Sequence, residues 1–307
     1  PPLVTGIVVL MIGISLLKVG FKYAGGGVWL MNNKPEIFAN WHHLTIAGTV
    51  LIVALLTNLK GRGMVSAASI LIGIIAGFIV AAVLGEVRWA KIAAADWFAF
   101  PMPLQYGIDF VWGAVILMLF MSIVTTIETI GDISATTMGG ANREATDKEL
   151  SGGIMADGVG TAFASIFNAM PNTSYSQNAG LVAFTGVISR HVGTVAGVIL
   201  ILLGLFPKLG GIIAAMPDSV IGGAAIIMFG LIAGAGIKLI SKSEMSQRNV
   251  LILALSLSFG IGLYAFPEFV AHVPDLGIKL GLLLTTGLIP AGLLAFILNA
   301  TLPKGKK

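Results

Sequence analysis

The chain has 307 residues, of which 56% are hydrophobic and only 10% are charged, with a mean hydropathy of +0.96. Because soluble domains carry about 25% charged residues, this composition excludes an ordinary soluble domain and indicates an integral membrane protein. The absence of cysteine excludes disulfides and thiol chemistry, and the net charge of +4 requires no nucleic-acid partner, since positive loops are expected beside a membrane.

Ten apolar segments follow one another along the chain, and all but a short, broken sixth are longer than barrel strands. They cover residues 3–17, 43–59, 64–84, 110–130, 152–167, 175–185, 192–206, 219–236, 250–264 and 280–300. The 40 glycines fit helices that approach one another closely, as in residues 222–225 and 230–236. The expected fold class is an all-α integral membrane protein.

The basic residues between these segments indicate how the chain is oriented. If the spans alternate, one side of the membrane receives eleven Lys and Arg residues and the other receives seven. An excess of basic residues marks the cytoplasmic side. We therefore expect a multi-pass protein of the plasma (inner) membrane whose C-terminus, with Lys304, Lys306 and Lys307, is cytoplasmic.

Residues 171–186 combine a polar half with an apolar half. Gln177 and Asn178 lie inside the sixth segment, where lipid offers an amide no partner. Irregular polar backbone at membrane depth is tolerated only inside protein or along a cavity, so this segment is the first candidate for a binding site. Gln177 offers donors and an acceptor to a planar ligand, on which Tyr175 could stack. The alternatives are that the two amides satisfy each other and the backbone, and that Tyr175 packs in the protein.

Three acidic residues fall in apolar surroundings. Glu128 and Asp132 are four residues apart, so both carboxylates share one helix face. An acid inside a span costs at least about 2.5–3.5 kcal/mol and marks a substrate or proton path; the alternative is a carboxylate that caps a backbone or pairs with a loop cation. Asp157 lies about one turn into the fifth segment, where it stabilises a helix N-terminus, tunes proton coupling or braces the broken segment.

The sixth segment carries a recognisable motif. Gln177, Asn178 and Gly180 are followed after four residues by Thr185 and Gly186. This run resembles the signature of the nucleobase–ascorbate transporters, also called the nucleobase:cation symporter-2 family. Supporting matches lie at Glu128-Thr-Ile-Gly-Asp132, Ala156-Asp157-Gly158 and Leu205-Phe-Pro-Lys208.

The resemblance implies an inverted-repeat transporter with core and gate domains and a broken strand/half-helix segment around 173–186. It assigns residues 1–106 to gate spans of the first repeat, 107–210 to the core spans with the substrate site, and 211–307 to gate spans of the second repeat; the first span belongs to the core or borders it. It also implies that the protein is a homodimer and is not an enzyme. A proton or a sodium ion would be the coupling ion, and no other cofactor and no metal are expected.

The family motif also implies roles for individual residues. Glu128 and Gln177 would form the substrate-binding pair, and Tyr175 and Ser176 would contribute backbone contacts. Residues that would support the site and its coupling are Asp132, Asp157, Asn178, Gly180, Thr185 and Gly186. Because uracil-type members carry Glu at the Gln177 position and usually Arg after the Thr, Gln177 and Gly186 favour the purine branch, with xanthine, uric acid or both as substrate.

Other readings differ in what they require of the sequence. Transport of uracil or another nucleobase by the same family is the nearest alternative. An aqueous channel would need a ring of like charges or a carbonyl filter, and an intramembrane hydrolase would need a base beside Ser176; neither pattern is present. Since the family has about fourteen spans, this chain resembles its members from their fifth span onward, and we expect the segment without the first four spans not to transport alone.

Overall fold

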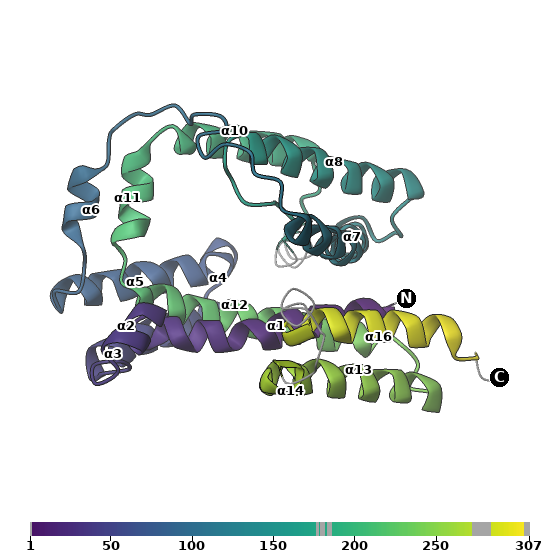
Figure 1. Ribbon diagram of the computed structural model, residues 1–307. Helices are drawn as coiled ribbons and strands as arrows, with labels where there is room; N and C mark the ends of the chain where they lie inside the picture. Colours follow the sequence, from purple (N-terminus) through teal and green to yellow (C-terminus); the bar gives the residue numbers. More distant parts are fainter. Residues whose placement is uncertain (1, 176–177, 179–181, 183–185, 272–283, 304–307) are drawn as a thin grey trace. The chain divides into compact units, whose positions relative to one another are not determined.

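The computed structural model describes residues 2–175, 178, 182, 186–271 and 284–303 (Figure 1), and over these residues the regular secondary structure is helical, with no strand. The helices are α1 (Pro2–Ala24), α2 (Val28–Asn33), α3 (Trp41–Lys60), α4 (Met64–Ala67), α5 (Ser69–Val83), α6 (Trp89–Ala94), α7 (Trp112–Ala141), α8 (Asp147–Ile166), α10 (Arg190–Gly204), α11 (Pro207–Ala215), α12 (Asp218–Ile240), α13 (Gln247–Ala265), α14 (Glu268–Ala271) and α16 (Leu288–Thr301). The predicted all-α class is confirmed.

Several helices are long and apolar enough to cross a membrane. Among the described residues, α1, α3, α7, α12 and α13 meet this criterion by length and composition. The helices α10 and α11 form a sixth candidate if they are counted as one span bent by 82°. The bend has a local cause, because Pro207 stands at the start of α11 and cannot donate the backbone hydrogen bond that would continue α10.

Several predicted segments differ from the observed helices in their extent, and two of them differ most. The segment 64–84 is divided into α4 and α5, and the segment 110–130 continues as α7 for another eleven residues, to Ala141. A helix of 30 residues is about 45 Å long, which exceeds the roughly 30 Å thickness of a bilayer's hydrocarbon core. One end of α7 can therefore lie outside the hydrocarbon layer.

The chain divides into two compact units, each assembled from segments that are distant in sequence. The first contains Pro1–Leu16, Leu104–Ala183 and Gly230–Lys307, and the second contains Leu17–Pro103 and Phe184–Phe229. The division at residues 106 and 210 into gate, core and gate spans concerns the transport cycle and stays a prediction.

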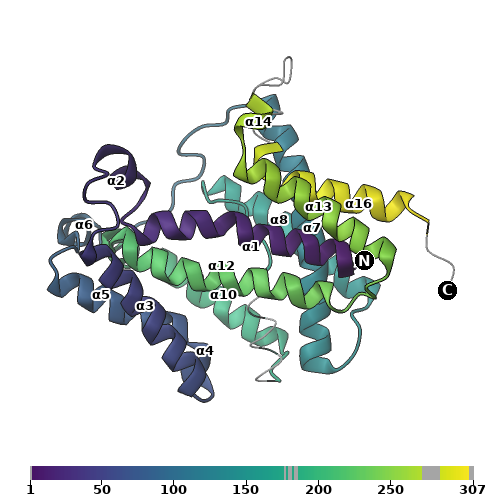
Figure 2. The same ribbon diagram turned by 90° about the horizontal axis from the view of Figure 1, so that it is seen from below.

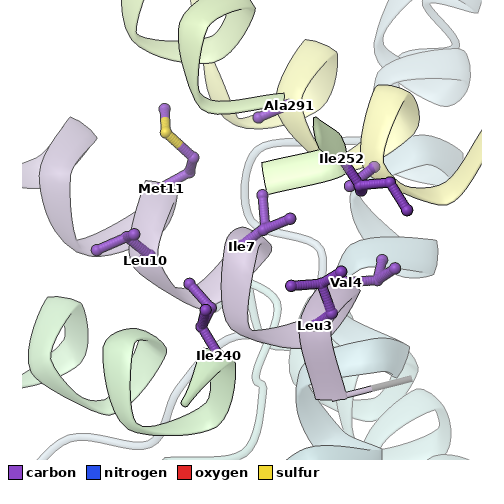
Figure 3. Close-up of a cluster of buried hydrophobic side chains, with 9 residues drawn as sticks. Leu3, Val4, Ile7, Leu10, Met11, Ile240, Ile252 and Ala291 are labelled. Atoms are coloured by element: carbon purple, nitrogen blue, oxygen red, sulfur yellow. The ribbon is translucent and has the colours of Figure 1, made fainter. Parts of the chain in front are cut away.

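The core of the first unit is built on the N-terminal half of α1. Ile7 and Met11 are fully buried there, and Figure 3 shows them with the side chains of Ile240, Ile252 and Ala291, which come from α12, α13 and α16. The helices approach closely because small residues face one another: a Cβ atom on Gly260 would lie only 2.7 Å from the Cβ atom of Ala291.

The first unit also places two helix ends together through Arg248, at the start of α13. Its guanidinium donates to the backbone oxygen of Asn299 (2.6 Å) and to that of Leu302 (3.2 Å). These carbonyls belong to the last turn of α16 and to the residue after it, where a cation is favourable because the carbonyls lack partners within the helix. The start of α13 and the end of α16 therefore lie on the same side of this unit.

The second unit is centred on α3 and α5, which lie side by side (Figure 2). Ile46 and Val50 of α3 are fully buried, and Gly73 and Gly77 of α5 leave room for them. Small residues thus set the helix separation in this unit too.

The short helices α6 and α11 also pack against each other (Figure 1). Lys208 of α11 donates from its Nζ atom to the backbone oxygen of Ala95, the residue after α6, at 2.8 Å.

Candidate functional site

The first part of the site lies on α7 and carries two carboxylates. Glu128 and Asp132 are one turn apart on this helix, and both side chains are half-buried. Thr129, next to Glu128, is 3% exposed. The predicted sharing of one helix face is confirmed by this helical spacing.

The second part of the site lies on α8, whose start is fixed by a capping box. The Thr146 hydroxyl accepts from the backbone N–H of Glu149, and the Glu149 carboxylate accepts from the backbone N–H of Thr146. The third turn of the helix carries Asp157, whose Oδ2 atom accepts a hydrogen bond of 3.3 Å from the Thr129 hydroxyl of α7. Asp157 is therefore a link between two helices, and it lies too far from Thr146 to stabilise the N-terminus of α8.

The third part is the start of the polar segment, which returns to both helices. Ser174 donates from its hydroxyl to Asp132 Oδ2 at 2.5 Å, and Asn172 donates from Nδ2 to Asp157 Oδ1 at 3.3 Å. Residues 171–175 form no strand, and two of their side chains, those of Asn172 and Ser174, bind α8 and α7. The strand expected at residues 173–176, at the start of the 173–186 segment, is therefore not found over 173–175, and residue 176 lies outside the described part of the chain.

Other predicted residues are only partly covered by the structure. Tyr175 is 54% exposed, and its backbone oxygen accepts from the N–H of Asn178 at 2.9 Å. Gly186 has a φ of +68°, a left-handed conformation that glycine adopts without strain. The remaining predicted residues lie outside the described part of the chain; they are Ser176, Gln177, Gly180 and Thr185.

The electrostatic character of the site is acidic. Glu128 lies within electrostatic range of both Asp132 and Asp157. Within the described part of the chain, neither Glu128 nor Asp157 takes part in an ion pair. No group of three His, Cys, Asp or Glu side chains arranged to hold a metal ion occurs among the residues that the structure describes. Three acids in apolar surroundings can bind N–H groups of a ligand or carry a proton.

Sequence reasoning missed the hydroxyl and amide groups that connect these acids. Thr129, Asn172 and Ser174 each contact an acid that was singled out, and Thr161 of α8 donates to the side-chain oxygen of Asn172 at 2.8 Å. Only the position of Asn172 and Ser174 in a polar run among apolar segments gave a signal. Thr129 and Thr161 are indistinguishable in sequence from hydroxyls that bind their own helix.

These observations define a class of protein. It is a multi-pass membrane protein whose acidic site lies between two helices and is contacted by a polar segment. A family model described as "Permease family" matches residues 1–269. The chain therefore belongs to this family, the nucleobase:cation symporter-2 family that its motifs resemble.

Individual relatives cover nearly the whole chain. A protein of Clostridium perfringens named as a purine permease is 39% identical over 302 residues, which are 98% of this chain and 65% of that protein. The xanthine permease XanP of Escherichia coli is 35% identical over 310 residues, with 100% of this chain and 66% of XanP covered. The uric acid permease PucJ of Bacillus subtilis is 35% identical over 301 residues, with 97% and 66% covered.

The chain thus spans just under two thirds of the length of these relatives. The names of the family and of the relatives denote transport proteins and no enzyme. Together with the long apolar helices, they establish a multi-pass membrane protein.

Proposed function

We propose that this protein is part or all of a secondary transporter that moves a purine base, xanthine or uric acid or both, together with a proton or a sodium ion. The observation that carries the proposal is that Asp132 and Asp157 both bind the start of the polar segment, and that Glu128 lies within electrostatic range of both acids. Acids at membrane depth mark substrate and ion paths. Relatives of matching sequence are named as xanthine and uric acid permeases.

The chemistry of the site suits a purine. An ionised carboxylate only accepts hydrogen bonds, so Glu128 is suited to ring N–H groups, whereas the amide of Gln177 can meet an edge that both donates and accepts. Charge-assisted hydrogen bonds are about twice as strong as neutral ones, which favours Glu128 as the anchor of the base. We further propose that Asp132, Asp157, Asn178, Gly180, Thr185 and Gly186 support the site.

Uptake into proteoliposomes tests this proposal. The chain, fused to or co-expressed with the family's first four spans, is purified, reconstituted and given radiolabelled xanthine, with a proton gradient, a sodium gradient or neither. Saturable uptake that one gradient drives, and that unlabelled xanthine or uric acid inhibits better than uracil, is the expected result. Inhibition by uracil alone would indicate the other nucleobase branch, and uptake linear in xanthine concentration would indicate a channel.

We also propose that the C-terminus is cytoplasmic and that the protein forms a homodimer in the plasma (inner) membrane. The excess of basic residues on one set of loops supports the orientation, and Arg248 links the start of α13 to the end of α16. Because the chain has no cysteine, Lys306→Cys and Lys34→Cys give single labelling sites on opposite predicted sides. In intact cells, a membrane-impermeant maleimide should label the Lys34→Cys variant and leave the Lys306→Cys variant unlabelled. The proposed homodimer is tested separately, by light scattering of the detergent-purified protein.

A further inference from the structure

Both oxygens of the Asp157 carboxylate are engaged by groups from other parts of the first unit. Oδ2 accepts from the Thr129 hydroxyl at 3.3 Å, and Oδ1 accepts from Asn172 Nδ2 at 3.3 Å. Thr129 belongs to α7 and Asn172 to the polar segment. Asp157 therefore stands between the two elements that carry the candidate substrate-binding pair, since Thr129 follows Glu128 and Asn172 lies five residues before Gln177.

The amide of Asn172 is held in one orientation. Its side-chain oxygen accepts from the Thr161 hydroxyl at 2.8 Å, and its backbone oxygen accepts from the same hydroxyl at 3.1 Å. Because the oxygen end is occupied by Thr161, the Nδ2 end faces Asp157. Asp157 and Thr161 are one turn apart on α8 and so present acceptor and donor on the same face.

The space around this amide is restricted as well. A Cβ atom on Gly160 would lie 3.0 Å from Asn172 Nδ2, so a side chain at that position would crowd the amide. Asn172 thus lies against the backbone of α8 in addition to its two hydrogen-bonding partners. The start of the polar segment is therefore held against α8 by complementary donors and acceptors, while Asn172 remains exposed.

We propose that Asn172 and Asp157 are positioning residues: they hold the polar segment at a set distance from α7, and Asp157 serves the purine site through Asn172 without touching the base. This inference rests on the proposed function for its binding readout. It assigns a role to Asn172 and Thr161 and selects the bracing role for Asp157 from the three that the sequence left open.

A charge exchange between the two positions tests the pair. Asn172→Asp places two carboxylates about 3.3 Å apart, in the geometry that now joins amide to carboxylate, and should weaken equilibrium binding of radiolabelled xanthine by about ten- to hundredfold. Adding Asp157→Asn restores one donor facing one acceptor. The new amide at position 157 can donate to the new carboxylate at position 172, and that carboxylate still accepts from the Thr161 hydroxyl. Binding should return to within about threefold of the unmodified protein.

Thr161 provides a second test at a residue that is not among those proposed to touch the base. Thr161→Val removes the hydroxyl that orients Asn172 and should weaken xanthine binding about fivefold, whereas Thr161→Ser keeps the hydroxyl and should not. Ser165→Ala is the matched control, because the Ser165 hydroxyl bonds only to Ala162 of its own helix among the described residues. A folding defect would show in thermal unfolding of the same samples.

Hydrogen exchange gives a readout that needs no substrate. The backbone amides of residues 172–175 should exchange faster in Thr161→Val than in Thr161→Ser. Unchanged exchange, or a charge exchange that leaves binding as weak as in Asn172→Asp, would overturn the inference. If the unmodified protein binds no xanthine even when it is joined to the family's first four spans, the proposed function fails, and the exchange rates still decide whether Asn172 is held as inferred.

Discussion

Ser174 and Asp132 are 42 residues apart in sequence and are joined by a hydrogen bond of 2.5 Å from the serine hydroxyl to Oδ2 of the carboxylate. Asp132 follows Glu128 by one helical turn, so this bond places the polar segment beside the carboxylate proposed to bind the purine. The bond is charge-assisted when Asp132 is ionised, which makes it stronger than a neutral pair.

Removing this hydroxyl should weaken the site without unfolding the protein. Ser174→Ala is expected to reduce xanthine affinity by about 1.5 kcal/mol, or roughly tenfold, because Asp132 loses a donor. Ser174→Thr keeps the hydroxyl and serves as the control. Equilibrium binding of radiolabelled xanthine to the purified variants gives the comparison, and equal affinities for Ala and Thr would separate Ser174 from the site.

Glu128→Gln tests the anchor of the base. The amide replaces an acceptor-only carboxylate by a group that also donates, so a ring N–H of the purine meets a weaker acceptor. We expect a loss of at least about 1.5–3 kcal/mol in xanthine binding, with normal amounts of protein in the membrane. Glu36→Gln, at an exposed carboxylate of the second unit, should bind as the unmodified protein does. Near-normal binding by Glu128→Gln would remove this residue from the site.

The parts of the site that were predicted from sequence are those set by local geometry. Glu128 and Asp132 share a face because four residues make about one helical turn. The contacts of Asp157 with Asn172, and of Asp132 with Ser174, could not be predicted, because they join helices to a segment without regular structure. No periodicity encodes such a contact.

The helix ends show the same distinction. A hydropathy window ended the fourth segment at residue 130, but α7 continues because Ser134 and Thr137 bond back to the carbonyls of Ile130 and Ile133. Polar side chains that are satisfied within their own helix do not terminate it. The bend before α11 did have a sequence signal, Pro207, which hydropathy alone does not read.

The start of α8 should depend on pH. Two hydrogen bonds from Arg143, at 2.8 and 2.5 Å, and one from the Thr146 N–H hold the pKa of Glu149 well below its usual value near 4.5. A lowered folded-state pKa adds stability that is complete above the unfolded-state value and is lost as the pH falls toward the folded-state value. Glu149→Gln should therefore lower the melting temperature at pH 7, and its difference from the unmodified protein should shrink below about pH 4.5.

Thermal unfolding in detergent between pH 3 and 8 measures this difference. The control is Glu144→Gln, because Glu144 is exposed and its side chain has no hydrogen bond among the described residues. A melting-temperature difference for Glu149→Gln that is the same at pH 3 and pH 7 would show that the ionised carboxylate does not stabilise α8.

Two glycines of α12 should respond in opposite directions to the same substitution. A Cβ atom on Gly222 would overlap the backbone of Tyr23 and Ala24, in the last turn of α1, whereas no described atom lies within 4 Å of a Cβ atom on Gly234. Gly222→Ala should therefore destabilise the protein by about 1–3 kcal/mol through overpacking against a backbone that cannot yield. Gly234→Ala should be neutral or stabilising by up to about 1 kcal/mol, because alanine restricts the unfolded chain and favours the helix.

Melting temperatures and the monodisperse fraction in size-exclusion chromatography compare the two variants directly. If both variants lose stability equally, close packing of α1 against α12 is not what requires glycine at position 222.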